Sequence, residues 1–306
     1  MDFSWTQEQM QLRDTIVKFA QSTLNEGLLE RDKEAKFNHE GWKKAAEFGI
    51  HGLPVPEAYG GLGTDPLSTI YALEAFGYGC KDNGLSFSIN AHMWTCEIPL
   101  LTFGTEAQKQ KYLPRLCDGS LIGGNAMSEP DSGSDAYSLR TTAELKGDKY
   151  ILNGSKVFVT NGPVADVFLV FATIDRQKGA RGVTGFFVEK TFPGFTVSRK
   201  VEKMGIKTSP MGELFLDNCE VPVENRLGRE GAGVALFSHS MEWERGFILA
   251  SAVGAMHRLL DTCTQYAKDR KQFGQSISKF QLVSTKLVDM KLRLETARPY
   301  FTMSDG

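Results

Sequence analysis

Residues 121–162 read LIGGNAMSEPDSGSDAYSLRTTAELKGDKYILNGSKVFVTNG, a loop rich in Gly, Ser and Asp joined to two strand-like runs. From Asn125 to Pro130, small polar side chains precede a proline, which favours an exposed loop that presents backbone N–H groups. The turn Gly133-Ser134-Asp135 lets a bulky ligand approach the backbone. Taken alone, the stretch is more typical of a surface hairpin than of a binding site. Other parts of the sequence are needed to distinguish a surface hairpin from a binding site.

The character of the sequence changes on both sides of this stretch. Towards the amino terminus, apolar residues recur at near-helical intervals in segments 6–20, 40–48 and 67–78. From Gly233 onward, periodic apolar segments return with no proline before Pro299. Between them the apolar runs are short, β-branched or aromatic, and separated by turn formers; they cover 150–152, 157–159, 167–171, 185–188 and 213–216.

These changes predict an α+β protein with three domains. We expect a helical amino-terminal domain over 1–120, a compact antiparallel β domain resembling a barrel over 121–232, and a helical bundle domain over 233–306. The length of 306 residues and the hydrophobic content of 41% are sufficient for a sizeable core.

Composition excludes several classes of function. A net charge of −2 argues against a nucleic-acid-binding protein. No run is long enough to span a bilayer, and the first residues lack the pattern of a signal peptide, so we expect a cytoplasmic protein without membrane contact. The five cysteines lack CxxC spacing, and His92, His239 and His257 lack metal-ligand spacing. We therefore expect reduced thiols, structural histidines and no metal site.

Two further motifs change the interpretation of residues 121–162. The motif MEWERG occupies 241–246, and DRKQFG at 269–274 is followed by Phe280-Gln281. Together with 121–162, their order and spacing resemble the acyl-CoA dehydrogenase superfamily, and the resemblance runs from the amino-terminal FSWTQEQMQLRDTIVKFA to about Arg298. Within the superfamily, LSFSINAH at 85–92 and MEWER look most like the branch that oxidises acyl or prolyl groups tethered to carrier proteins.

The resemblance predicts more chain after the last helical segment. Relatives of this type place several helices after the one containing Leu287 to Arg298, and these complete a four-helix bundle. The sequence printed here ends with residues 300–306, which do not resemble that continuation. We therefore expect an incomplete bundle with a truncated or altered carboxyl terminus and exposed apolar faces. The missing part would include a Gly-Gly motif for a neighbour's adenosine and a loop over the thioester.

The chemistry implied by the family requires a carboxylate base beside a flavin. The base removes an α-proton while a hydride leaves the β-carbon, and burial helps the base by raising its pKa. Some branches carry the catalytic Glu just before an arginine, which identifies Glu244, followed by Arg245, as the expected base. Glu242 projects about 200° away on a helix. The resemblance places Glu242 and Arg245 on the substrate side. Without the resemblance, we would interpret Glu244 as an ordinary carboxylate on the surface of a helix.

The resemblance also implies FAD as the cofactor. It places Asn125, Met127 and Ser128 along the isoalloxazine ring, with Phe158 as an aromatic wall and Thr160 near N5. Ser134 would contact the pyrophosphate or the substrate's pantetheine. A second group would reach the FAD of a neighbouring subunit, which implies a homo-oligomer, usually a tetramer; it comprises Arg270, Gln272, Phe273 and Gln281.

Three functions remain open at this stage. The first is an FAD-dependent dehydrogenase or oxidase acting on the CH–CH or CH–NH group of an acyl or aminoacyl thioester on a carrier protein, such as prolyl thioester in secondary metabolism. The second is a short- or branched-chain acyl-CoA dehydrogenase. The third is a non-catalytic, truncated binding subunit. The electron acceptor would be an electron-transfer flavoprotein or oxygen. A basic cluster could bind an acidic carrier protein or CoA phosphates, or be an ordinary solvated edge; it contains Arg199, Lys200, Lys203 and Lys207.

Overall fold

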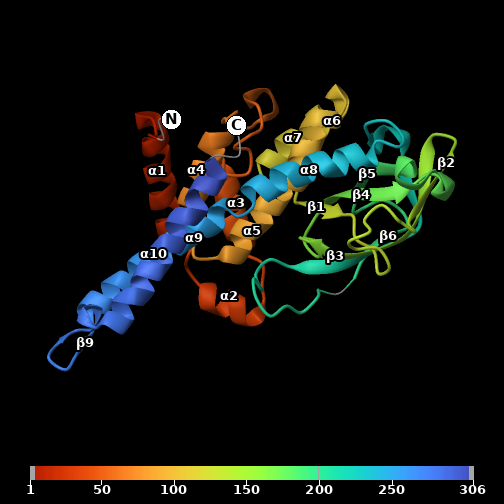
Figure 1. Cartoon of the computed structure of the whole chain (residues 1–306). Coiled ribbons are helices and arrows are strands. Elements are labelled where there is room, and N and C mark those ends of the chain that lie inside the picture. Colours follow the sequence, from red (N-terminus) through yellow and green to blue (C-terminus); the bar gives the residue numbers. More distant parts are fainter. Residues whose placement is uncertain (1–3, 199, 303–306) are drawn as a thin grey trace.

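The computed structural model describes residues 4–198 and 200–302 and shows a β-sheet region flanked by helices (Figure 1). The expected α+β class is confirmed. Arg199 of the basic cluster and residues 303–306 of the unexpected ending lie outside the described residues. The proposed domain limits at 120 and 232 stay a prediction. Among the described helices, none is both long and apolar enough to cross a membrane.

The amino-terminal region is helical, and several of its helices begin with a side-chain cap. Thr6 and Gln9 cap each other at the start of the first helix, and Thr105 and Gln108 do the same at the last. Asp65 caps the helix that begins at Pro66. The helices are α1 (Gln7–Thr23), α2 (Leu28–Glu34), α3 (His39–Glu47), η1 (Glu57–Tyr59), α4 (Pro66–Gly79), α5 (Asn83–His92), the π-turn η2 (Met93–Glu97), α6 (Ile98–Phe103) and α7 (Glu106–Cys117).

The central region is a mixed sheet in the order β6-β7-β3-β2-β4-β5-β8, with β1 beside β4. Most pairs are antiparallel, as expected, whereas β1 runs parallel to β4 and β2 meets β4 in parallel at Thr142–Thr173. All of β4 is buried. The strands are β1 (Gly123–Ala126), β2 (Thr142–Lys146), β3 (Lys149–Thr160), β4 (Val167–Thr173), β5 (Val183–Glu189), β6 (Phe195–Val197), β7 (Met211–Pro222) and β8 (Arg226–Leu227), with the short helices η3 (Arg176–Gly182) and η4 (Val223–Asn225).

The carboxyl-terminal region lies over the sheet and then leaves the body of the molecule. Helix α8 (Gly233–Phe247) passes over the sheet, and α9 (Ala250–Asp269) packs against α4. The two helices α4 and α9 approach closely because Gly77 and Gly254 have no side chain; a Cβ on either would lie 1.9 Å from a backbone oxygen of the other helix.

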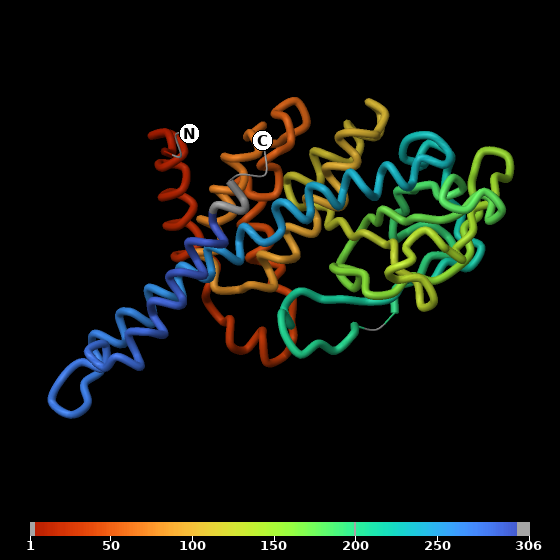
Figure 2. Tube along the Cα trace, in the orientation of Figure 1, coloured from red at the N-terminus to blue at the C-terminus, as the bar shows by residue number. Residues whose placement is uncertain are grey.

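Helices α9 and α10 (Gln281–Thr302) run side by side as an arm that projects from the body (Figure 2). At its tip, the strands β9 (Lys271–Gln272) and β10 (Gln275–Ser276) form a hairpin that leads into η5 (Ile277–Lys279). Large apolar side chains on the arm are exposed, among them Leu282, Val288 and Leu292. An exposed apolar surface of this kind is typical of an interaction site.

Candidate functional site

Six of the residues singled out in the sequence line one cavity of about 170 Å³ between α8, β1, β3 and the end of α5. They are Asn125, Met127, Ser128, Phe158, Thr160 and Glu244. Ala91, Thr95, Val157 and Phe237 complete the lining. The cavity therefore joins the loop after β1, the end of β3 and the middle of α8, which are far apart in the sequence.

Glu244 is the ionisable residue in this lining. It is half-buried, and burial raises its pKa above the ordinary glutamate value, while the neighbouring Arg245 lowers it. Glu242, on the same helix, is exposed and does not line the cavity, and Arg245 is also exposed. The structure thus separates the two glutamates as the helical spacing predicted. A half-buried carboxylate with a raised pKa has the properties of a general base.

Aromatic packing holds α8 over the cavity. Trp243 and Phe247 on α8 stack on each other, and the ring of Phe247 lies 4.9 Å from that of Trp94 in the π-turn. The Ser240 hydroxyl donates a hydrogen bond to the Trp94 carbonyl oxygen at 3.2 Å. Because these contacts fix the rotation of the helix about its axis, Glu244 is turned towards β1 and β3.

Phe158 forms an exposed wall of the cavity in a strained conformation. Its φ angle is +57° and its side chain is 66% exposed, at a bulge in the pairing of β3 with β7. A bulky residue rarely adopts a positive φ, and such strain is concentrated at functional sites. Thr160 lies two residues further along the strand. The aromatic face, the amide of Asn125 and the hydroxyls of Ser128 and Thr160 suit a flat ring with a polar edge.

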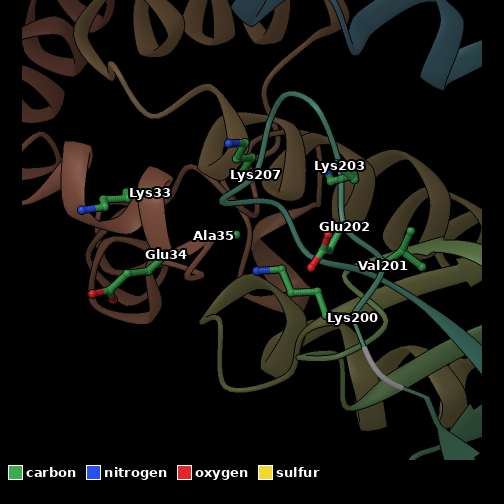
Figure 3. Close-up of a pocket in the computed structure, with 8 residues that line it drawn as sticks. All are labelled: Lys33, Glu34, Ala35, Lys200, Val201, Glu202, Lys203 and Lys207. Atoms are coloured by element: carbon green, nitrogen blue, oxygen red, sulfur yellow. The ribbon is translucent and has the colours of Figure 1, made fainter.

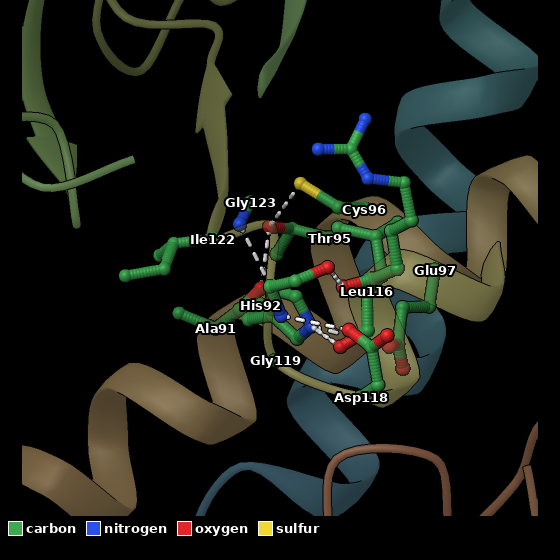
Figure 4. Close-up of polar contacts among 12 residues, drawn as sticks. Ala91, His92, Thr95, Cys96, Glu97, Leu116, Asp118, Gly119, Ile122 and Gly123 are labelled. Atoms are coloured by element: carbon green, nitrogen blue, oxygen red, sulfur yellow. Dashed lines mark hydrogen bonds and ion pairs between the residues drawn. The ribbon is translucent and has the colours of Figure 1, made fainter. Parts of the chain in front are cut away.

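A buried network holds β1 from the side of the π-turn (Figure 4). His92 accepts a hydrogen bond at Nδ1 from the Gly123 N–H (2.9 Å), so its Nε2 carries the proton and points to Glu97 Oε1 at 3.1 Å. Burial raises the pKa of Glu97, and His92 opposes this rise. The Cys96 thiol donates to the Gly124 carbonyl oxygen at 3.2 Å. His92 is therefore a hydrogen-bonded structural histidine, as expected, but one next to the candidate site.

Two amide side chains connect this network to the cavity. Asn125 donates from Nδ2 to the carbonyl oxygen of Thr95, so the π-turn contacts a cavity residue directly. The buried Asn161 donates from Nδ2 to the carbonyl oxygens of Ser88 and Gly123, and therefore ties β3 to α5 and β1. The sequence alone indicates no role for Asn161. Its φ of +64° lies in the left-handed region, where asparagine is enriched, and the Asn-Gly pair at 161–162 is the turn signal that the sequence offers.

The remaining predicted site residues lie outside the cavity. Ser134 is exposed in the loop after β1. Arg270, Gln272 and Phe273 are exposed at the tip of the arm, and Gln281 is exposed at the start of α10. Phe273 is 93% exposed with a φ of +49°. A single chain does not bring these residues to the cavity, so their contact with a neighbouring subunit's FAD stays a prediction.

The lysines of the basic cluster line a different cavity, of about 430 Å³ (Figure 3). Lys200, Lys203 and Lys207 come from the loop between β6 and β7, and Lys33 comes from α2. Burial lowers the pKa of Lys200 and Lys203, and Lys200 lowers that of Lys203 further. This cavity shares no lining residue with the one that contains Glu244. In the described parts of the chain, no group of three or more His, Cys, Asp or Glu is placed to hold a metal ion.

The chain belongs to the acyl-CoA dehydrogenase family. The family's N-terminal domain matches residues 6–120, its middle domain residues 124–219 and its C-terminal domain residues 231–302. The family is FAD-dependent, and the cavity lining suits the flat ring of that cofactor. The chain is therefore an FAD-dependent oxidoreductase by family.

Among individual members of the family, the chain is similar to enzymes named for prolyl carrier proteins and to enzymes named for acyl-CoA. The chain is 42% identical to the L-prolyl-[peptidyl-carrier protein] dehydrogenase of a Serratia species, over 97% of this chain and 77% of the relative. It is 40% identical to the short-chain-specific acyl-CoA dehydrogenase of Clostridium acetobutylicum, over 97% and 78%. Among solved structures, the prolyl acyl carrier protein oxidase AnaB superposes with a TM-score of 0.96 at 57% identity, covering 98% of this chain and 80% of AnaB. PigA with FAD and proline superposes with a TM-score of 0.95 at 41% identity, covering 99% and 80%.

Proposed function

We propose that the protein is an FAD-dependent dehydrogenase or oxidase of a thioester tethered to a carrier protein, with a prolyl group as the preferred substrate. The observation that carries the proposal is the meeting of Glu244, Phe158 and Thr160 in one cavity. The similarity to AnaB and to the Serratia dehydrogenase supports the prolyl carrier protein as the substrate.

In this proposal Glu244 acts as the base. It removes the proton from the carbon next to the thioester carbonyl, and its raised pKa makes proton transfer easier than for an exposed glutamate. When bound, FAD supplies the acceptor for the hydride. Phe158 packs against the flat ring, while Asn125, Ser128 and Thr160 provide polar groups at its edge. Ser134, Glu242 and Arg245 are proposed contacts for the substrate's arm, because they lie on the loop and helix that flank the cavity.

The second candidate is a short- or branched-chain acyl-CoA dehydrogenase. The matches to the Clostridium enzyme and, at 41% identity, to an isovaleryl-CoA dehydrogenase from Pongo abelii favour it. Both candidates use the same base and cofactor, and both substrates end in the same pantetheine arm. A non-catalytic binding subunit is disfavoured by the half-buried Glu244 in the cavity lining.

We further propose a cytoplasmic homo-oligomer, a tetramer as in the family, in which the arm tip of one chain completes the FAD site of another. The exposed Arg270 and the exposed apolar residues of the arm support this arrangement. The proposed electron acceptor is oxygen or an electron-transfer flavoprotein. Measuring flavin reoxidation in air and under anaerobic conditions with such a flavoprotein separates the two.

The test is a substrate comparison. The purified protein with FAD is incubated separately with prolyl-loaded carrier protein, prolyl-CoA and a short-chain acyl-CoA, and the products are examined by mass spectrometry. The proposal predicts the loss of hydrogen from the prolyl carrier protein at the highest kcat/KM. A higher kcat/KM for the acyl-CoA would support the second candidate, and no oxidation of any thioester by flavin-loaded protein would support the binding subunit.

A further inference from the structure

A buried ion pair lies directly behind the cavity wall. Lys156, in the middle of β3, and Glu129 have side chains that are 0% and 3% exposed, and the Nζ of Lys156 lies 2.7 Å from Oε1 of Glu129. Charged residues are almost never fully buried unless they are paired. Neither residue was assigned a role from the sequence, and neither lines the cavity.

The carboxylate of Glu129 closes the loop that carries Ser134. Besides Lys156, its oxygens accept hydrogen bonds from the backbone N–H of Arg140 at 2.6 Å and of Thr141 at 3.1 Å. The Glu129 backbone also pairs with that of Ser132. One side chain therefore joins the two ends of the loop between β1 and β2, and the loop's path depends on a carboxylate at this position.

The ammonium group of Lys156 reaches the cavity wall itself. It donates to the carbonyl oxygen of Met127 at 3.1 Å, and the next residue, Val157, donates from its backbone N–H to the carbonyl oxygen of Ser128 at 2.9 Å. Met127, Ser128 and Val157 all line the cavity. Contacts at consecutive residues thus hold the segment after β1 against β3, just where the two form the wall.

We propose that the Lys156–Glu129 pair positions the flavin. It holds Met127 and Ser128 against β3, at the place where they would contact the flavin ring. The inference rests on the proposed placement of the flavin in this cavity, and it is independent of which thioester is oxidised. A pair of apolar residues could fill the same volume, and such replacements of buried ion pairs are often neutral or stabilising. They could not, however, accept from two backbone amides and donate to Met127.

The pair also predicts a dependence on pH. Burial lowers the pKa of Lys156 to about 8, against the opposing effect of Glu129, which is the charged group that faces it. As pH rises through this value, Lys156 loses its charge and the contact with Met127 weakens. Across the same range, the lowered pKa means that the unfolded chain binds more protons than the folded one, so this group makes folding more favourable as pH rises. Weaker flavin binding without loss of stability is therefore the expected signature.

The experiment compares Lys156→Met/Glu129→Gln with the parent and with Lys149→Met. The double variant avoids an unpaired buried charge, which could unfold the single variant. Lys149 is a matched control because it lies on the same strand and pairs with Glu220 at the same 2.7 Å, but in an exposed position. Each protein is titrated with FAD, the visible circular dichroism of the bound flavin is recorded, and Tm is measured between pH 6 and 9.

We expect the double variant to fold, to bind FAD about tenfold more weakly, as expected for the loss of a charge-assisted contact, and to show an altered flavin spectrum. It should lack the weakening of FAD binding above about pH 8 that we expect for the parent. Lys149→Met should match the parent. A folded double variant with the parent's FAD affinity, spectrum and pH profile would overturn the inference. If the double variant fails to fold, the parent itself provides the test: an FAD affinity that does not weaken between pH 6 and 9 would overturn the inference. Because these measurements use no thioester, they test the role of the ion pair even if the substrate comparison contradicts the proposed function.

Discussion

The cavity and the tip of the arm carry the two halves of the proposed FAD site, and they differ in how their residues are held. Around the cavity, strand β1 is fixed by His92, Cys96 and Asn161 through hydrogen bonds to its backbone. At the tip of the arm, Arg270 and Phe273 are exposed and project away from the body. The cavity can therefore be prearranged within one chain, whereas the tip gains a binding role only when another molecule meets it.

The largest effect should follow from changing the base in the cavity. Glu244→Gln keeps the shape of the side chain but cannot accept the α-proton, so we expect flavin reduction by substrate to fall by about 100-fold or more with FAD still bound. Stopped-flow absorbance of the flavin measures this step. Glu242→Gln is the matched control, because Glu242 is exposed on the same helix, and it should have a milder effect. Reduction by Glu244→Gln at the parent's rate would remove Glu244 as the base.

A smaller effect is expected at the tip of the arm. Arg270→Ala removes a guanidinium that we propose to bind the pyrophosphate of a neighbour's FAD, and we expect the affinity for FAD to fall about tenfold. Fluorescence titration with FAD measures it, at a protein concentration at which the parent is oligomeric. Arg293→Ala is the control, since Arg293 is also exposed on the arm but pairs with Asp289. Equal affinities in the two variants would mean that the arm tip is not part of the site.

Phe158 allows the cavity to be tested in a third way, through strain. In Phe158→Gly the positive φ no longer has a steric cost, so we expect the free energy of unfolding to stay the same or to rise by about 1 kcal/mol. We also expect weaker FAD binding, because the aromatic contact is lost. Tm and FAD titration measure the two effects. Phe215→Gly is the control: Phe215 is partly exposed on β7 without a positive φ, and its loss should lower Tm. A lower Tm in both variants would contradict strain at Phe158.

The smallest expected effect is on stability at neutral pH. Because burial raises the pKa of Glu244, its folded form binds a proton more tightly than its unfolded form, and its contribution to stability falls as pH rises through the raised pKa. Glu244→Gln should therefore have a higher Tm than the parent near pH 7 and a smaller advantage at acid pH. Thermal unfolding from pH 4 to 8 in the absence of substrate measures this difference. An advantage that does not change with pH would exclude the mechanism.

The outline of the fold could be predicted from local sequence patterns, whereas the group of cavity residues followed from the resemblance of several motifs to the acyl-CoA dehydrogenase family. Helical periodicity and strand composition gave the α+β class, and MEWER with residues 121–162 pointed to Glu244, Ser128 and Thr160. Spacing alone does not reveal that these residues share a cavity. The hydrogen bond between Val157 and Ser128 joins two of the segments, and the packing of α8 against Trp94 brings Glu244 to them.

Other features left no local signal. A lysine within a strand is ordinarily expected to face water, so the buried position of Lys156 opposite Glu129 depends on partners 27 residues away. The residue type at position 158 does not indicate a positive φ, because bulky residues such as phenylalanine rarely adopt the left-handed backbone conformation. Similarly, residues 93–97 contain no sequence mark of a π-turn. These are places where tertiary contacts outweigh local preference.

The π-turn between α5 and α6 has a consequence for how this region tolerates insertions and deletions. A π-turn accommodates one residue more than an α-helical turn, so the helix that follows it is out of phase by about 100° with the helix before it. Deleting one residue from 93–97 would let an unbroken α-helix form, which is locally favourable, yet it would swing Glu97 away from His92 or the whole of α6 away from its packing. Length, as much as residue identity, is therefore constrained between His92 and Ile98.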